Sequence, residues 1–194
     1  MNIKNYIQDS IDTKTKILND ENILSTINNI ADAIVNAYKN DKKVLTAGNG
    51  GSAGDAQHIA GELVSKFFFD RPGLCAFSLA TDTSILTAIG NDYGYEKSFS
   101  RQIQANAKEG DIFIGISTSG NSKNIVMALE EAKKKGVTTV GFVGEKECKM
   151  DGLCDYIIHV PSPSTPTIQE SHIMIGHIIC ALVEEAIFSK AGVL

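Results

Sequence analysis

The sequence predicts an α/β protein, folded as a three-layer α/β/α sandwich in a single domain over residues 1–194. Short apolar runs rich in β-branched residues alternate with longer segments of helical periodicity, which is typical of a parallel sheet covered on both faces. Two of these runs end in glycine- and serine-rich loops that open a helical segment. The chain has 194 residues, 43% of them hydrophobic, so it can build one sizeable core.

Two amphipathic helices are expected ahead of the first strand. Apolar side chains recur at helical spacing in residues 2–19 and again in 21–40, and a charged turn at 40–42 ends the second segment. We assign residues 1–42 to a helical pair that takes part in oligomer packing.

The middle of the chain is expected to alternate strands with helices. The expected strands are five short apolar runs, at 43–47, 74–79, 111–117, 138–143 and 155–160. The expected helices between them follow a 3.6-residue period, at 53–67, 83–89, 96–107 and 121–135. Gly136 stands where a residue in the left-handed conformation commonly ends a helix.

A proline- and serine-rich loop, PSPSTPT at 161–167, is expected to cross to a long apolar helix at 168–188. This helix is too apolar to lie on the surface of a monomer. Subunit packing and burial against the sheet both account for it.

Composition excludes some classes of function. A net charge of −5 argues against a general nucleic-acid binder, and the basic run at 133–135 is interpreted as a solvated helix end. The first residues lack the apolar stretch of a signal peptide, and no uninterrupted apolar run approaches a membrane span, so we expect a cytoplasmic protein.

Cys75 and Cys180 are expected to be buried free thiols, and a metal site at Cys148 and Cys154 is disfavoured.

The first loop, GNGGSAGDAQH at 48–58, has neither the GxGxxG spacing of dinucleotide sites nor the lysine of a Walker loop. By itself it is a tight turn from strand to helix. The second loop, STSGNSKN at 117–124, gathers four hydroxyls at a predicted helix N-terminus. Such a cluster suits a phosphate dianion better than a plain helix cap does. Two glycine- and serine-rich loops of this kind, each between a strand and a helix, imply that the protein binds a phosphorylated metabolite.

His58 and Glu62 stand four residues apart on the helix after the first loop, about 6 Å apart along its axis. A surface pair is the simpler interpretation. Their position one to two turns beyond the glycine loop favours a shared ligand.

A third polar group, Gln169, Glu170, His172 and His177, interrupts the start of the apolar C-terminal helix. His172 is interpreted as a satisfied polar contact, and His159, at the end of a strand, as structural. Gln169 and His177 would lie roughly 12 Å apart on a continuous helix. Convergence on one ligand therefore needs long side chains, an unwound helix start or two subunits.

At these segments the chain resembles the phosphoheptose isomerase family of sugar-isomerase (SIS) domain proteins. The resemblance rests on GNGGSAGDAQHIAGEL, IGNDYGYEKSFSRQ, GDIFIGISTSGNSKN and IQESHIMIGH, and it extends over almost the whole chain. It implies a flavodoxin-like, five-stranded parallel sheet and a homotetramer with active sites at subunit interfaces. It also implies conversion of sedoheptulose 7-phosphate to D-glycero-D-manno-heptose 7-phosphate, the entry to ADP- or GDP-heptose for lipopolysaccharide or capsule.

The resemblance also implies a set of site residues. One zinc ion per subunit would be held by His58, Glu62, Gln169 and His177. Substrate contacts carried over by the resemblance are Asn49, Gly50, Gly51, Ser52, Glu62, Asn91, Asp92, Ser117, Thr118, Ser119, Ser122 and Gln169.

The reaction so implied passes through a cis-enediol. It requires a base for the carbon-bound proton and a group that moves a proton to or from the oxygens; our hypothesis assigns these roles to Glu62 and His177. Two other functions remain open. One is a non-catalytic SIS protein that binds a phosphosugar or serves as a replication-initiator scaffold, and the other is an isomerase of another ketose phosphate.

Overall fold

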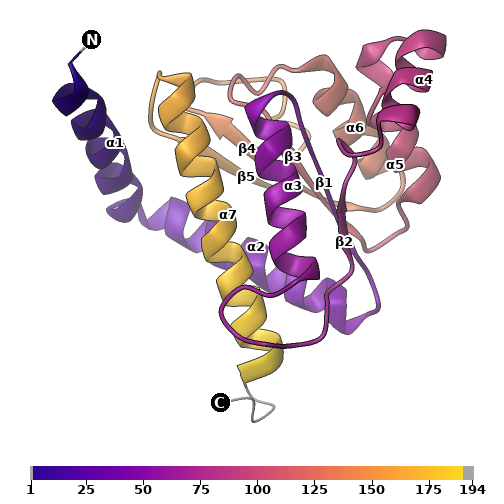
Figure 1. Ribbon diagram of the computed structural model, residues 1–194, viewed down its shortest axis with the longest axis horizontal. Coiled ribbons are helices and arrows are strands. Elements are labelled where there is room, and N and C mark those ends of the chain that lie inside the picture. The colour runs from indigo at the N-terminus through magenta and orange to yellow at the C-terminus, as the bar shows by residue number, and fades with distance from the viewer. Residues whose placement is uncertain (1, 190–194) are drawn as a thin grey trace.

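A five-stranded parallel sheet forms the middle layer of the computed structural model, which describes residues 2–189 (Figure 1). Met1 and residues 190–194, which the predicted single domain includes, lie outside the described residues. The strand order is β2-β1-β3-β4-β5, and every neighbouring pair is parallel. The strands are β1 Val44–Gly48, β2 Ala76–Ser78, β3 Ile112–Ile116, β4 Thr138–Gly144 and β5 Tyr156–Val160. The α/β/α prediction is confirmed, and each strand lies within the predicted run or extends one residue beyond it.

The strand order reverses direction between β1 and β3. The chain passes from β1 outward to β2 and then returns to the other side of β1 to form β3, β4 and β5. Gly48, which ends β1, is the partner of Ile116, which ends β3. The loops that leave these strands therefore diverge from one point, and open parallel sheets bind ligands at such a point.

Helices cover both faces of the sheet (Figure 1). The first face is covered by α2 (Glu21–Lys39), α3 (Gly51–Val64) and α7 (Thr165–Phe188), whose side chains share one core cluster. The second face is covered by α5 (Ser100–Asn106) and α6 (Lys123–Lys134). Two more helices, α1 (Ile3–Leu18) and α4 (Thr83–Tyr93), lie at the periphery, and a 3-10 turn, η1 (Tyr95–Lys97), follows α4.

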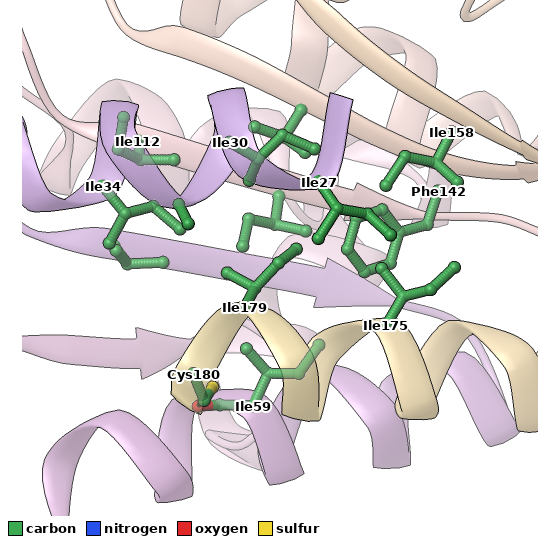
Figure 2. Packing of buried hydrophobic residues seen from close by; sticks show 14 of the residues in the cluster. Ile27, Ile30, Ile34, Ile59, Ile112, Phe142, Ile158, Ile175, Ile179 and Cys180 are labelled. Atoms are coloured by element: carbon green, nitrogen blue, oxygen red, sulfur yellow. Dashed lines mark hydrogen bonds between the residues drawn. The ribbon is translucent and has the colours of Figure 1, made fainter. Parts of the chain in front are cut away.

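Close packing of α7 on α3 and the sheet explains its apolar sequence. Ile175 and Ile179 point into the core toward Phe142 of β4, and Cys180 lies beside Ile59 of α3 (Figure 2). A Cβ at Gly176 would lie 2.7 Å from the Ile59 side chain, so the two helices approach as closely as glycine permits. Among the described residues, α7 is the helix that is long and apolar enough to cross a membrane, and the core helix of a soluble protein passes the same test.

Several element boundaries differ from the sequence prediction. The third helix ends at Val64 rather than residue 67 because the Arg71 guanidinium donates to the carbonyls of Glu62 and Leu63 and so caps the helix. The predicted helix at 96–107 is divided into η1 and α5. The C-terminal helix begins at Thr165, because a proline in the first turn of a helix removes no intrahelical hydrogen bond.

Two single-residue expectations have opposite outcomes. Gly136 has a φ of +68°, which confirms that it ends α6 in the left-handed conformation. Cys75 was expected to be buried and is exposed, because it precedes the short edge strand β2, whereas Cys180 is buried as expected.

Candidate active site

The first glycine loop turns sharply between β1 and α3. Gly50 has a φ of +57°, a conformation that favours glycine. A Cβ on Gly51 would lie 2.5 Å from Nε2 of Gln169, so this side chain of α7 lies directly against the backbone at the start of α3. The loop is therefore more than a turn, because it brings a helix N-terminus, a buried Ser52 and the Gln169 amide to one place.

The second loop gathers its hydroxyls at the N-terminus of α6. Oγ of Ser117 lies 2.9 Å from Oγ of Ser122 and 3.5 Å from Oγ of Ser119. Ser122 is the N-cap residue, yet its side chain makes no capping hydrogen bond. Its hydroxyl is therefore directed into the loop, as expected for an anion site and not for a plain cap.

A cavity of about 260 Å³ adjoins this loop. Its walls come from the second loop and from the segments that follow β4 and β5, and they include Thr118, Ser119, Asn121, Glu145, Ser162 and Thr165. Both loops and the cavity lie beyond the carboxyl ends of the strands, and the cavity adjoins the ends of β3, β4 and β5.

Asn124 and Tyr95, which the sequence interpretation did not assign to the site, connect the loops through Asn49. The amides of Asn49 and Asn124 are paired reciprocally, with Nδ2 to Oδ1 distances of 2.9 and 2.8 Å. The Tyr95 hydroxyl donates to Oδ1 of Asn49 over 3.0 Å. Asn124 is 3% exposed, and it closes the STSGNSKN motif, which was the one sequence signal available for it.

The side chains of His58, Glu62 and His177 converge between α3 and α7. Nε2 of His58 lies 3.0 Å from Oε1 of Glu62 and 3.3 Å from Nε2 of His177. One atom from each of the three residues lies within 4.8 Å of the other two. The edge of one imidazole meets the face of the other, and Phe67 packs beside His177 with ring centroids 5.6 Å apart.

These three residues fit a divalent metal ion. Two imidazoles and a carboxylate are a donor set that zinc uses in proteins, and two zinc ligands at tetrahedral angles stand about 3.3 Å apart. The spacing of the two Nε2 atoms matches that value. His58 and Glu62 are therefore more than an isolated surface pair, because a third donor from another helix meets them.

Gln169, the fourth predicted metal ligand, lies elsewhere in this chain. Helix α7 is continuous from Thr165 to Phe188, so the helix start is not unwound. Gln169 lies against Gly51, roughly 12 Å along the helix axis from His177. Within one chain Gln169 lies against the glycine loop, so its predicted role as a metal ligand beside His177 stays a prediction.

Asn91 and Asp92 are near the end of α4. Their side chains hydrogen-bond to each other over 2.8 Å. No hydrogen bond joins either of them to the two loops in the part of the chain that the structure describes. None of the eleven residues of α4 is buried, so their predicted contact with substrate stays a prediction.

Three further ionisable groups near the site have distinct roles. Burial raises the pKa of Asp55 to about 6, partly opposed by His58, and its Oδ2 is buried without a hydrogen-bond partner. Burial lowers the pKa of His172 to about 4, so this residue is neutral, and its Nε2 lies 3.1 Å from the carbonyl of Val143. His159 contacts the Gly144 carbonyl and Asp151. His172 is only half satisfied, because its Nδ1 is buried without a hydrogen-bond partner.

Comparison with known proteins agrees with this geometry. Residues 5–144 match the family model of the SIS domain. Over 186 residues the chain is 66% identical to the phosphoheptose isomerase of Aneurinibacillus thermoaerophilus, covering 96% of this chain and 94% of that protein. It is 61% identical to phosphoheptose isomerase 2 of Campylobacter jejuni subsp. jejuni, with coverages of 97% and 94%.

Solved structures give the same result. The phosphoheptose isomerase of Francisella tularensis superposes with a TM-score of 0.91 at 34% identity, covering 94% of this chain and 96% of that one. The fold, the matched length and the identity thus agree over nearly the whole chain, and the chain belongs to the phosphoheptose isomerase family of SIS domain proteins.

Proposed function

We propose that this protein is an aldose–ketose isomerase that converts sedoheptulose 7-phosphate to D-glycero-D-manno-heptose 7-phosphate. The proposal is carried by one observation: an acid–base cluster of Glu62 and two imidazoles occurs in a chain whose relatives are named phosphoheptose isomerases. The product would enter ADP- or GDP-heptose synthesis for lipopolysaccharide or capsule in the cytoplasm.

The second loop, at residues 117–124, binds the phosphate of the substrate. Ser117, Thr118, Ser119 and Ser122 supply hydroxyls, and the N-terminus of α6 supplies a positive dipole end. Asn49 and Gly51 in the first loop, with Gln169 beside them, contact the sugar hydroxyls. Binding at the phosphate holds the reacting carbons in place and so converts remote binding energy into orientation.

Glu62 and His177 carry out the proton transfers. The carboxylate of Glu62 removes the proton from the carbon next to the carbonyl, giving the enediol, and returns it to the neighbouring carbon. The imidazole of His177 moves a proton between the two oxygens. The 3.0 Å contact between His58 and Glu62 orients the carboxylate for this task.

We further propose that the cluster holds one zinc ion per subunit. His58, Glu62 and His177 of one chain are the ligands, and Gln169 is the fourth ligand expected by family resemblance. A zinc ion bound there would polarise the carbonyl and stabilise negative charge on the enediol oxygens.

The homotetramer with active sites between subunits is part of the proposal. Two peripheral helices expose apolar side chains: Ile3, Ile7 and Ile11 on α1, and Ile85 and Tyr93 on α4. Covering α4 with a second subunit would also support Asn91 and Asp92, which α4 carries. The long separation between Gln169 and His177 is consistent with a site shared by two chains.

The alternative functions are less well supported. A phosphosugar sensor or a scaffold does not require a carboxylate and two imidazoles that converge on one point. An isomerase of another ketose phosphate would use the same cluster, so substrate tests must distinguish the two.

Turnover of sedoheptulose 7-phosphate by the purified protein, with the aldoheptose detected by NMR, tests the proposal. We expect product that disappears with a chelator and returns with zinc. Turnover unaffected by the chelator would contradict the proposed zinc site. If sedoheptulose 7-phosphate is inert while a pentulose or hexulose phosphate reacts, the substrate assignment is wrong, and if all are inert the protein is a non-catalytic binder.

A further inference from the structure

A buried ion pair lies just below the His58, Glu62 and His177 cluster. Nε of Arg71 lies 3.0 Å from Oε2 of Glu184, and both side chains are 1% exposed. Glu184 belongs to α7, and Arg71 belongs to the segment that connects α3 to β2. Buried charges are rare unless they are paired and hydrogen-bonded, and both members of this pair have further hydrogen-bond partners.

Backbone N–H groups satisfy the hydrogen-bond acceptors of the Glu184 carboxylate. It accepts hydrogen bonds from the N–H groups of Phe67, Phe68 and Phe69, at 2.6, 2.7 and 3.2 Å. Burial alone would raise its pKa, but these three donors and Arg71 outweigh burial and hold the pKa of Glu184 below its ordinary value. The carboxylate therefore holds the chain that follows α3 against α7.

Arg71 uses its other nitrogens to cap α3. Nη1 donates to the carbonyl of Leu63 over 2.6 Å, and Nη2 donates to the carbonyl of Glu62 over 2.8 Å. The guanidinium thus binds the backbone of the residue whose side chain is the proposed base. Its planar arrangement of donors suits several acceptors at once, which a lysine ammonium does not match.

The ion pair also acts on His177. Glu184 follows His177 by seven residues, two turns along the same side of α7. Phe67, whose N–H binds Glu184, packs its ring against the His177 imidazole. One buried pair therefore binds the backbone of Glu62 and the backbone of Phe67, whose ring packs beside His177.

We propose that Arg71 and Glu184 are positioning residues that set α3 against α7 and so fix the separation of Glu62 from the His58 and His177 imidazoles. This inference rests on the proposed metal-dependent isomerase and adds two residues that touch neither substrate nor metal. Groups that orient metal ligands from behind typically change metal affinity or activity by roughly 10- to 100-fold when they are replaced.

The chain offers a matched control for this pair. Asp111 is also 1% exposed, pairs with Nζ of Lys43 at 2.6 Å, and accepts backbone N–H groups from Lys43 and Lys108. It immediately precedes β3, and its partners Lys43 and Lys108 lie outside α3 and α7. Asp111→Asn removes a comparable buried carboxylate without touching α3 or α7.

The experiment compares Glu184→Gln with Asp111→Asn in the full-length, metal-free protein. Cobalt(II) affinity is measured by titration of its visible absorption, thermal unfolding is measured with chelator present, and kcat and KM are measured after metal is restored. We expect both variants to unfold at lower temperature than the wild type. Only Glu184→Gln should weaken cobalt binding, by about tenfold or more, and lower kcat more than it raises KM.

A second variant keeps the test decisive if Glu184→Gln does not fold. Arg71→Lys retains the charge opposite Glu184 but cannot bind the carbonyls of Glu62 and Leu63 together. It should lower cobalt affinity with a smaller loss of thermal stability.

Cobalt affinity and kcat equal to those of Asp111→Asn, in either variant, would overturn the positioning role while leaving the proposed isomerase intact. A wild type that binds no cobalt and turns over no ketose phosphate would instead overturn the proposed function and this inference with it.

Discussion

Among single residues, Glu62 has the most direct part in the proposed chemistry. Its carboxylate lies 3.0 Å from an imidazole, and in the proposed mechanism it exchanges a proton with carbon. Glu62→Gln keeps the size of the side chain but removes its basicity, so turnover should fall by about 10²- to 10⁴-fold. Substrate affinity, measured by calorimetry, should change much less.

The matched control for this variant is Glu130→Gln, which neutralises an exposed carboxylate on α6. It should keep full turnover. Near-normal turnover in Glu62→Gln would show that the base is another residue.

Asp55 predicts a pH-dependent change in stability. Burial raises its pKa from 3.8 to about 6 in the folded chain. The folded state then binds an extra proton between these values, so this group's contribution to stability falls as the pH rises from about 4 to 6 and stays low above it. Asp55→Asn removes the buried charge and should stabilise the metal-free protein at pH 8 by on the order of 1–3 kcal/mol.

Thermal unfolding of this variant and of the wild type, both with chelator at pH 4 and pH 8, checks the sign. The gain should be much smaller at pH 4, where Asp55 is protonated in the folded state and carries no buried charge. A gain of equal size at both pH values would mean that the buried charge is not its cause.

At the scale of elements, the loop between β3 and α6 shows how a helix start becomes a binding site. Ser122 stands at the N-cap position, but its hydroxyl bonds to Ser117 and not to the helix. Ser122 can therefore be interpreted as a phosphate ligand or as a plain helix cap, and the two interpretations predict different results for one substitution.

Ser122→Ala should raise KM for the phosphorylated substrate by about tenfold, because a hydrogen bond to a charged group contributes roughly 1.5–3 kcal/mol. Its thermal stability should stay close to that of the wild type. A plain cap would give the reverse, a loss of about 1 kcal/mol of stability with KM unchanged. Steady-state kinetics and thermal unfolding separate the two, with Ser25→Ala on α2 as the remote hydroxyl control.

The pairing of α3 with α7 is the second important feature at this scale. The two helices run side by side, with Gly51 against Gln169 near one end and Glu62 near Glu184 and Arg71 at the other. Gly176 allows the close approach between them. This packing produces a row of functional side chains from the glycine loop to the end of α3.

At the scale of the whole molecule, the exposed apolar face of α1 predicts assembly. Ile7 is 54% exposed and Ile3 72%, and burying one such side chain contributes roughly 1.5–3 kcal/mol. Ile7→Asp should therefore shift the oligomer toward smaller species, and light scattering after size-exclusion chromatography measures the mass.

Asp9→Lys, on the opposite side of α1 and also exposed, is the control and should keep the wild-type mass. Circular dichroism should show both variants folded. A wild type that is monomeric, or an Ile7→Asp variant that assembles as the wild type does, would contradict the assembly proposed for this face.

The features that could be predicted from the sequence are those that depend on residues close together in the chain. Strand runs such as 138–143 and the left-handed Gly136 were predicted correctly, because they depend on neighbouring residues and backbone sterics. The end of α3 was predicted three residues too late, because the cap comes from a side chain folded back from Arg71. Cys75 was misplaced because its exposure depends on β2 being an edge strand.

The sequence by itself determined the α/β class, the two loops and the candidate residues for the proposed chemistry. Tertiary structure alone decided that His177 meets His58 and Glu62, that Gln169 instead lies against Gly51, and that Asn124 links the two loops. It also revealed the pair between Arg71 and Glu184, 113 residues apart in the chain. The physical reason is that periodicity and spacing act within a few residues, whereas these contacts form only when the sheet order and helix packing bring distant segments together.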